Sequence, residues 1–403
     1  MRLTVLIVII YISTKILFAQ DMTNIDTDND IFIKSSNNSS EVIKFIRENK
    51  QSRVIDKKAY LDTIQFEHKG RYFFQNAPPF VILEDGNYVI GYEGNVGEKS
   101  ALYLYNEDGR FLKKVTRYGQ GPGEVCGSMT LCKDKNNFYV SDGIQRKILV
   151  FMNNGKYIRE VWQSTHWGYL AFKVSPVSDR YFYYHIFPTR KAKLFTMGNL
   201  KDGIIKEFGE LSMANKIAMH SKIQGIVFNE DGYLFVIKPA EYGFEIFDDN
   251  GNYIDKKTRK RPRFFKEIPE KVVKRIDKDH IYSVEVFFNN TRAQSVFYLG
   301  ENILIILYYR NYLLTGKKIT WKYLLSNNGK DLPELKFVTH IEFWETNGNY
   351  LGCCQLKGKF PGVSYAEKGY LYFWYQKDSM QGDYYPNPLL IRYDLWKELG
   401  WRK

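Results

Sequence analysis

Three histidines in the middle of the chain could together bind a metal ion. His166, His185 and His220 are well separated in the sequence, so only the fold could bring them together. Zinc in hydrolases and lyases accepts imidazole ligands. Isolated histidines are more often packing or surface residues, and no Cys-x-x-Cys or paired His spacing accompanies them. The sequence also shows no Ser-His-Asp or Cys-His arrangement with a supporting motif. A metal-dependent hydrolase or lyase, with Ca or Zn bound, is therefore the alternative to a protein without catalytic activity or cofactor.

A second group of residues could bind a ligand without reacting with it. Aromatic rings stack on the apolar faces of sugars or peptides, while polar groups beside them fix orientation. Aromatic residues make up 16% of the chain, so several rings would border any surface by chance. The candidate ligand-binding residues are Arg117, Glu124, Arg146, Trp167, His185, Arg190, His220, Tyr242 and Trp374. We expect a carbohydrate, peptide or protein ligand.

The four cysteines predict free thiols and not disulfide bonds. Cys126 and Cys132 are expected on one strand, where six residues separate them by about 20 Å, beyond the reach of a disulfide. Cys353 and Cys354 are adjacent and point to opposite faces of an extended strand.

The net charge of +13 does not predict a nucleic-acid-binding protein. Eleven Lys or Arg and three acids lie between Lys256 and Lys278, so most of the excess comes from one segment. Within it, Pro269 and the apolar residues Ile268, Val272, Val273 and Ile276 favour a short amphipathic helix. We expect its basic face to be solvated, with an acidic polysaccharide or anionic lipid as the alternative contact.

A repeated turn pattern provides the elements that position these residues. Glycine, Asn or Asp turns precede aromatic and β-branched runs, as in Asp85–Val89, Asp231–Phe235 and Lys368–Tyr372. An interleaved series at Gly109, Gly155, Gly203 and Gly251 has a spacing of about 46 to 48 residues, typical of four-stranded propeller blades. The pattern predicts an all-β fold, a six-bladed β-propeller of four-stranded antiparallel blades.

The stretch Arg117–Glu124, which contains Gly-Gln-Gly-Pro-Gly-Glu, resembles a motif of known protein families. With Asn137–Asp142 and Arg146–Tyr157 it resembles the NHL-type repeat. It is also similar to a family of exported bacterial six-bladed β-propellers that carry a Gly-x-Gly-Pro-Gly-Glu turn after the first blade. The resemblance implies the fold and export, but it does not indicate a particular biochemical activity. In physical terms the glycines allow a sharp reversal between blades, and Glu124 is placed to accept hydrogen bonds from nearby backbone N–H groups.

Four blades are predicted at Phe80–Arg117, Val125–Trp162, Tyr169–Leu211 and Ile223–Lys257. A fifth begins near Ala293 and a sixth near Pro361. The strand expected at Tyr60–Phe66 would close the ring by joining the last blade, which lacks its own outermost strand. Seven blades are the alternative if Lys318–Leu325 and His340–Phe343 belong to different sheets.

The N-terminus predicts export. Residues 1–19 have a basic start and a short apolar stretch typical of an export signal, and residues 20–58 form a polar, flexible leader. No cysteine lies near the end of the apolar stretch, so we expect neither a lipoprotein nor, in the mature chain, a transmembrane domain. An uncleaved membrane anchor is the alternative. Residues 59–403 should then form one propeller domain with a basic helical insertion near 256–290, located in the periplasm or at the cell surface. Its oligomeric state is left open.

In a propeller, the loops between the second and third strands of each blade and the connections between blades lie on one face, here called the channel face. Ligands of such folds usually bind there. All nine candidate residues are expected on it. The sequence therefore predicts a non-catalytic binding or interaction module.

Overall fold

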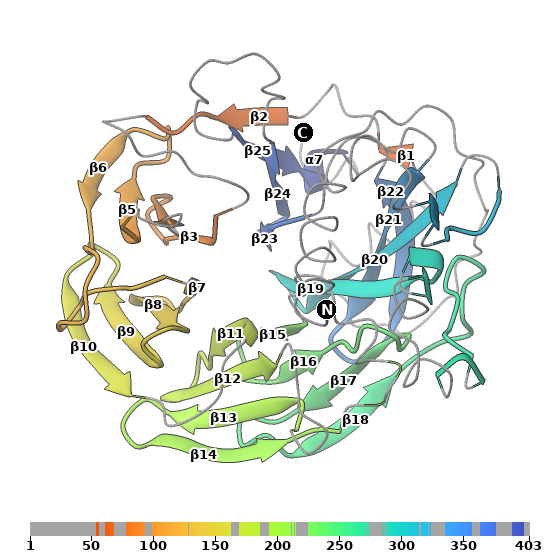
Figure 1. Ribbon diagram of the computed structural model, residues 1–403, viewed down its shortest axis with the longest axis horizontal. Helices are drawn as coiled ribbons and strands as arrows, with labels where there is room; N and C mark the ends of the chain where they lie inside the picture. The colour runs from red at the N-terminus through yellow and green to blue at the C-terminus, as the bar shows by residue number, and fades with distance from the viewer. Residues whose placement is uncertain are drawn as a thin grey trace.

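A computed structural model shows a ring of β-sheets around a central axis (Figure 1). The residues that it describes are 54–55, 61–67, 78–92, 99–127, 129–162, 169–185, 193–210, 212, 214, 225–269, 271–273, 285–286, 288–313, 316–320, 322–323, 335–356, 363–375 and 389–398.

Each of the first four blades is a consecutive antiparallel sheet with its first strand innermost. Blade one consists of β3 (Phe80–Ile82), β4 (Tyr88–Tyr92), β5 (Ala101–Tyr105) and β6 (Phe111–Lys114). Blade two consists of β7 (Met129–Lys133), β8 (Asn137–Asp142), β9 (Lys147–Met152) and β10 (Tyr157–Trp162). Blade three consists of β11 (Tyr169–Val174), β12 (Arg180–His185), β13 (Phe195–Asn199) and β14 (Gly203–Phe208). Blade four consists of β15 (Ile226–Phe228), β16 (Leu234–Val236), β17 (Phe244–Phe247) and β18 (Tyr253–Lys257).

The last two blades each include a strand from the N-terminal part of the chain. Blade five consists of β19 (Arg292–Gly300), β20 (Ile303–Leu313), β21 (Leu335–Glu345) and β22 (Tyr350–Leu356), to which β1 (Val54–Ile55) adds in parallel. Blade six consists of β23 (Tyr365–Glu367), β24 (Tyr370–Tyr375), β25 (Leu389–Asp394) and the outermost strand β2 (Leu61–Ile64). A short helix, α7 (Leu395–Glu398), follows β25.

The prediction of six blades is confirmed. The described residues form six sheets, and His340 and Phe343 both lie in β21 of blade five, so these residues do not support the seven-blade alternative. Cys126 precedes β7 and does not share that strand with Cys132, contrary to expectation. None of the four cysteines, all of which the structure describes, forms a disulfide bond.

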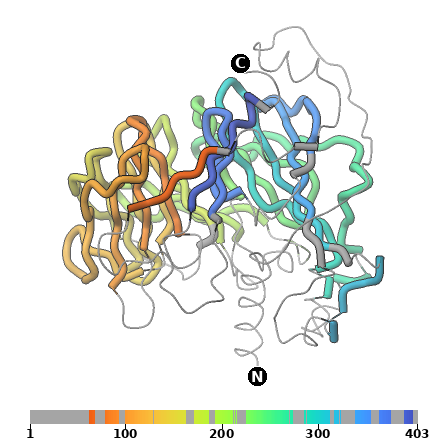
Figure 2. Tube along the Cα trace, turned by 90° about the horizontal axis from the view of Figure 1, so that it is seen from above, coloured from red at the N-terminus to blue at the C-terminus, as the bar shows by residue number. Residues whose placement is uncertain are grey.

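The N-terminal strand β2 closes the ring, as predicted. It pairs antiparallel with β25, from Leu61 opposite Tyr393 to Ile64 opposite Leu390. Figure 2 shows β2 running beside the blue C-terminal strands. The backbone N–H of Glu67 then donates to the carbonyl of Gly109 in blade one at 2.8 Å. Strand β1 lies within the segment predicted as leader and pairs with β22.

The hydrophobic core of the molecule is divided among the joints between blades. Six apolar clusters of described residues each combine strands of two neighbouring blades. In the joint of blades six and one, Phe66 packs edge-on against Tyr88 and Tyr105 and lies 5.8 Å from the Trp374 ring. The aromatic content noted in the sequence thus fills these joints, where rings bury much area.

The predicted turn glycines adopt the backbone conformation that they were expected to provide. Gly109 has a φ of +82°, and a Cβ there would lie 2.5 Å from the Gln65 carbonyl oxygen. Only glycine fits at this point of contact between the closing strand and blade one.

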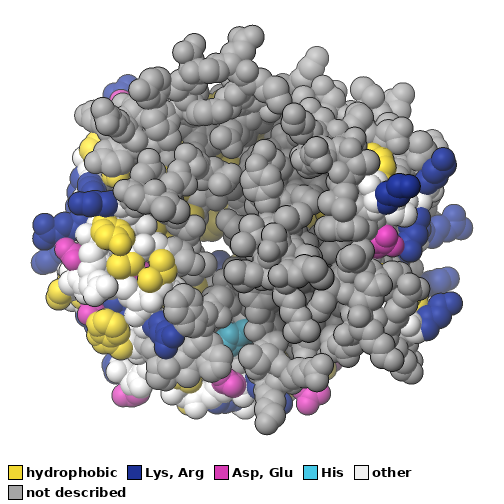
Figure 3. Space-filling view, in the orientation of Figure 1, with side chains coloured by type: hydrophobic (Ala, Val, Ile, Leu, Met, Phe, Trp, Pro, Cys, Tyr) yellow, Lys and Arg dark blue, Asp and Glu magenta, His cyan; other side chains and the backbone are white. Residues whose placement is uncertain are grey.

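The outer strands carry polar and exposed residues. In β6, for example, Leu112, Lys113 and Lys114 are exposed. Figure 3 shows Lys and Arg side chains of the described residues along the rim of the ring. In the basic insertion, residues 271–273 are helical. Among the described residues no helix has the length and apolar character needed to cross a membrane.

Candidate functional site

The structure places six of the nine candidate residues at the channel-face end of the strands. Arg117 and Glu124 lie in the β6–β7 connection and Arg146 in the β8–β9 loop, while His185 ends β12. Tyr242 lies in the β16–β17 loop, and Trp374 is near the end of β24. The remaining candidates, Trp167, Arg190 and His220, lie outside the described residues. Whether the nine bind a ligand stays a prediction.

Arg117 and Glu124 are the candidates that the structure brings together. The Nε of Arg117 lies 3.1 Å from Oε1 of Glu124, and the backbone N–H of Gly121 donates to Oε2 of Glu124 at 2.8 Å. A Cβ on Gly119 would lie 2.0 Å from the same oxygen. The glycines therefore allow the backbone to wrap around the carboxylate, and Glu124 has the structural role expected of it.

Two buried charged groups, Lys147 and Asp142, lie behind this turn. The side chain of Lys147 is fully buried, and its Nζ lies 3.1 Å from both the Gly121 carbonyl oxygen and Oε2 of Glu160. The carboxylate of Asp142 accepts hydrogen bonds from the backbone N–H groups of Cys126, Ile144 and Gln145. These groups hold the turn on blade two.

The described residues do not assemble the three-histidine metal site. His185 is buried, and its Nε2 forms a 2.6 Å hydrogen bond with Oγ1 of Thr196. His166 and His220 lie outside the described part of the chain. Within that part, no group of three or more His, Cys, Asp or Glu residues is arranged to hold a metal ion.

Tyr242 belongs to a buried polar cluster between blades four and five. Its hydroxyl donates to Oε1 of Glu342 at 2.7 Å, and Trp344 Nε1 donates to Oε2 at 3.1 Å. The guanidinium of Arg259 lies 3.0 Å from Oε1 and stacks 3.8 Å from the Tyr350 ring centre. Burial raises the pKa of Glu342, while Arg259 and the hydrogen bonds act in the opposite direction.

Trp374 is likewise used within the protein. Its side chain is buried, and its Nε1 donates to the Pro78 carbonyl oxygen at 3.0 Å. Tyr242 and Trp374 therefore present little ring surface to a ligand, and their contacts account for their burial.

A group of residues in blade five was missed by the sequence analysis, and we call it the blade-five group. It comprises Arg292, Tyr309, Asn311 and Thr339. Strand pairing places Arg292 opposite Tyr309 and Tyr309 opposite Thr339, and Asn311 lies two residues beyond Tyr309 on the same sheet face. The side chain of Tyr309 also interacts with Thr339 and with the backbone of Val363, which precedes blade six. The group thus lies toward the joint of blades five and six at the channel-face end.

Asn311 is the unusual member of the blade-five group. It is 3% exposed, and among the described residues neither its Oδ1 nor its Nδ2 has a hydrogen-bond partner. Arg292 is 6% exposed, and burial lowers its pKa to about 9, with a smaller opposing effect from Tyr309. Arg310 and Asn311 interrupt the apolar run of β20, and this interruption is the signal that could have identified the group from the sequence.

The sheets, their order and the central axis define the protein as a six-bladed β-propeller. Residues 95–248 match a protein family described as "6-bladed beta-propeller". A search of curated proteins finds no match.

Two solved structures are similar in fold. One is a candidate exported protein from Bacteroides fragilis, with a TM-score of 0.55 and 13% identity over 82% of this chain and 94% of that chain. The other is a member of the DUF4221 family from Bacteroides vulgatus, with a TM-score of 0.56 and 12% identity over 84% of this chain and 98% of that chain.

Proposed function

We propose that this protein is an exported, non-catalytic binding module that takes a polar ligand, a glycan or a peptide, at the channel face beside the blade-five group. The observation that carries the proposal is the Asn311 side chain, which is buried and whose two polar atoms have no partner within the part of the chain that the structure describes. An unpaired buried polar group costs about 1–3 kcal/mol, so such a group calls for an explanation. A carboxamide offers one acceptor and two donors, which match a peptide group or a pair of sugar hydroxyls.

Export is the second part of the proposal. It is supported by the apolar N-terminal stretch and by the description of the similar B. fragilis protein as a candidate for export. Cell fractionation followed by N-terminal sequencing of the mature protein tests it. A mature chain that begins after Ala19 supports the proposal, and an intact chain in the cytoplasm contradicts it.

The binding test compares Asn311→Ala with wild type in two measurements. Soluble oligosaccharides and short peptides are screened by calorimetry, and unfolding in urea is measured without ligand. We expect Asn311→Ala to reduce the affinity of any ligand found at least tenfold, while the ligand-free protein becomes as stable as wild type or more stable, because an unsatisfied amide has been removed.

Asn289→Ala is the matched control. The Nδ2 of Asn289 donates to the carbonyls of Glu285 and Ile319, so its loss should destabilise the fold and leave affinity unchanged. The assignment would be overturned if Asn311→Ala lost as much free energy of unfolding as Asn289→Ala. It would also be overturned if Asn311→Ala bound the ligand with unchanged affinity. Stoichiometric Ca or Zn in the purified protein would favour the metal-dependent enzyme instead.

A further inference from the structure

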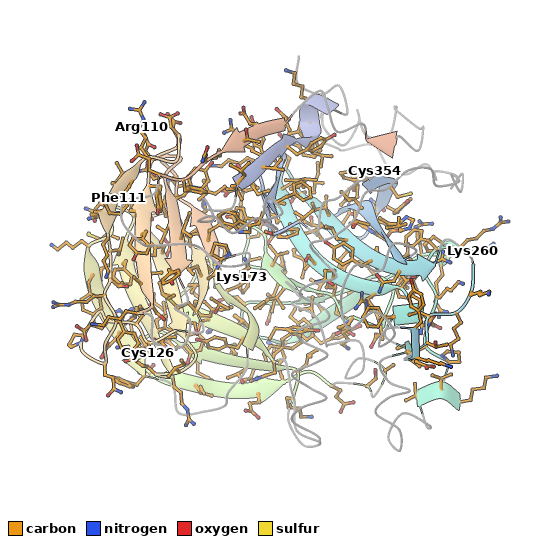
Figure 4. All side chains as sticks on the ribbon, turned by 45° about the horizontal axis from the view of Figure 1, so that its top comes forward. Arg110, Phe111, Cys126, Lys173, Lys260 and Cys354 are labelled. Carbon is orange, nitrogen blue, oxygen red and sulfur yellow. The ribbon has the colours of Figure 1, made fainter. Side chains whose placement is uncertain are left out.

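The opposite end of the central channel carries a set of charges that the proposed function does not use. We call it the charged mouth, and it comprises Glu84, Lys133, Lys173, Glu367 and Lys368. Lys133 ends β7, Lys173 is the penultimate residue of β11 and Glu367 ends β23, all on innermost strands. These strands start at the channel face, so their last residues lie at the other end. Figure 4 shows Lys173 toward the middle of the ring.

Four of these five side chains neutralise one another in a network that joins blades one, two and six. The Nζ of Lys133 lies 2.8 Å from Oε1 of Glu367 and 3.2 Å from Oε1 of Glu84. The Nζ of Lys368 lies 3.1 Å from Oε2 of Glu84 and 3.8 Å from Oε1 of Glu367. The Tyr365 hydroxyl donates to the other oxygen of Glu367 at 2.9 Å. Both carboxylates are therefore already occupied by lysines.

Lys173 is the exception in the charged mouth. It is half-buried, and within the described part of the chain its Nζ has no hydrogen bond or ion pair. Burial lowers its pKa, and Lys133 acts in the same direction, whereas Cys132 and Glu367 act oppositely. Three lysines here face two glutamates, so one positive charge is left without a counter-charge.

We propose that Lys173 binds one carboxylate group of a small ligand that enters the channel at the charged mouth. One uncompensated lysine matches one negative charge, and a charge-assisted hydrogen bond between them would replace the water that burial removes. A dianion such as a phosphate ester fits less well, because Glu84 and Glu367 would repel its second charge. A uronic acid and the C-terminus of a peptide both supply such a carboxylate.

The walls around Lys173 suit the organic part of the ligand. Cys132 is buried and interacts electrostatically with Lys173. Tyr365, whose hydroxyl donates to Glu367, also interacts electrostatically with Cys132 and adds an aromatic ring beside it. This site lies in blades one, two, three and six, apart from the blade-five group.

Thermal unfolding at constant ionic strength and neutral pH tests the proposal. Glucuronate and N-acetylglycine serve as probes, and methyl glucoside and N-acetylglycinamide serve as their uncharged counterparts. We expect a saturable rise in the melting temperature with the two carboxylates only, and at least tenfold weaker binding to Lys173→Met. A stronger response to glucuronate than to N-acetylglycine identifies an acidic sugar as the source, and the reverse order identifies a peptide terminus.

Two variants serve as controls. Lys201→Met removes an exposed lysine that pairs with Asp179 of blade three, outside the charged mouth, so it should keep the response. Asn311→Ala should also keep it, which separates this site from the proposed one. No response to either carboxylate, an equal response to the uncharged probes, or an unchanged response in Lys173→Met would overturn the assignment.

Discussion

Glu342 shows how single residues with buried charge are held in this molecule. Its side chain is fully buried, yet it has a hydroxyl, an indole N–H and a guanidinium as donors from three different segments. Removing one partner of such a buried pair is costly, because the other charge remains without compensation. Lys173 differs from Glu342, because within the described part of the chain its Nζ has no such partner.

His340 should make the stability of the fold depend on pH. It is buried and stacked on Phe264, with ring centres 3.9 Å apart. Burial lowers its pKa to about 3, with a further lowering by Arg310. The unfolded chain, with an ordinary pKa near 6.5, therefore binds more protons between these values. The contribution of His340 to stability is fully present above pH 6.5 and declines as the pH falls towards 3, by at most about 1.4 kcal/mol per pH unit.

The substitution His340→Phe should remove this dependence while keeping an aromatic ring against Phe264. We expect the free energy of unfolding of the variant, measured in urea, to fall less steeply than that of wild type between about pH 7 and about pH 4. Phe264→Leu disturbs the stack without removing a titrating group, so its curve should run parallel to that of wild type. Parallel curves for His340→Phe would show that the imidazole does not titrate in this way.

At the scale of elements, the glycine-rich turn between blades one and two is built around the Glu124 carboxylate. Gly119→Ala would place a methyl group where Oε2 now lies, 2.0 Å away, and force the side chain out. The Gly121 N–H would then lose its acceptor. We expect a loss of about 1–2 kcal/mol in the free energy of unfolding.

A double-mutant cycle with Glu124→Ala isolates the cause. Once the carboxylate is gone, the new methyl group of Gly119→Ala no longer clashes with it. The loss in the free energy of unfolding caused by Gly119→Ala should then be at most half of the loss in wild type. Any contribution from backbone strain is the same in both backgrounds. Urea unfolding of the four proteins measures the coupling. Strictly additive losses would mean that Glu124 does not shape the turn.

The elements were more predictable from the sequence than the contacts between them. Turn glycines such as Gly109 and Gly251, each followed by a strand that contains an aromatic residue, indicated the strands of blades one to four to within a few residues. This was possible because the positive φ of a turn glycine and the alternation of side chains along a strand are local properties. Alternation indicates which face of a sheet a residue occupies but not which residue of the next blade it meets. The pairing of Glu342 with Arg259, and the position of Lys173 beside Glu367, depend on such non-local contacts.

The candidate site shows the same limit. Glu124 could be assigned a structural role because its partner Gly121 lies three residues away. Tyr242 and Trp374 were placed at the correct end of their blades, but their burial depends on Glu342 and Pro78, which are distant in sequence. Asn311 was overlooked because a polar residue late in a long strand resembles the start of a loop.

For the whole molecule, closure of the ring by β2 is the decisive contact. Blade six supplies three strands from the C-terminal part of the chain, and β2 covers the edge of β25 with four paired residues. Asp62 also forms an ion pair with Arg392 across this pair. Phe66, 2% exposed, then fills the joint between the first and last blades. An open sheet edge beside an uncovered aromatic joint would favour association between molecules.

Removal of residues 1–67 should therefore open the ring, whereas removal of residues 1–53 keeps both N-terminal strands and serves as the control. We expect the protein lacking residues 1–67 to melt at a markedly lower temperature and to form oligomers on size-exclusion chromatography, because β25 and the Tyr88 and Trp374 rings lose their cover.

A synthetic peptide spanning residues 59–67, added in excess, should raise the melting temperature of this protein in proportion to the logarithm of the peptide concentration, since it binds the folded ring and not the unfolded chain. The same peptide with Ile64→Asp would place a carboxylate in a position that is 6% exposed in the joint and should have no effect. If the protein lacking residues 1–67 melts like the control and stays monomeric, the five complete blades and the three-stranded sixth hold the ring without β2, and closure by the N-terminal strand is not what stabilises this propeller.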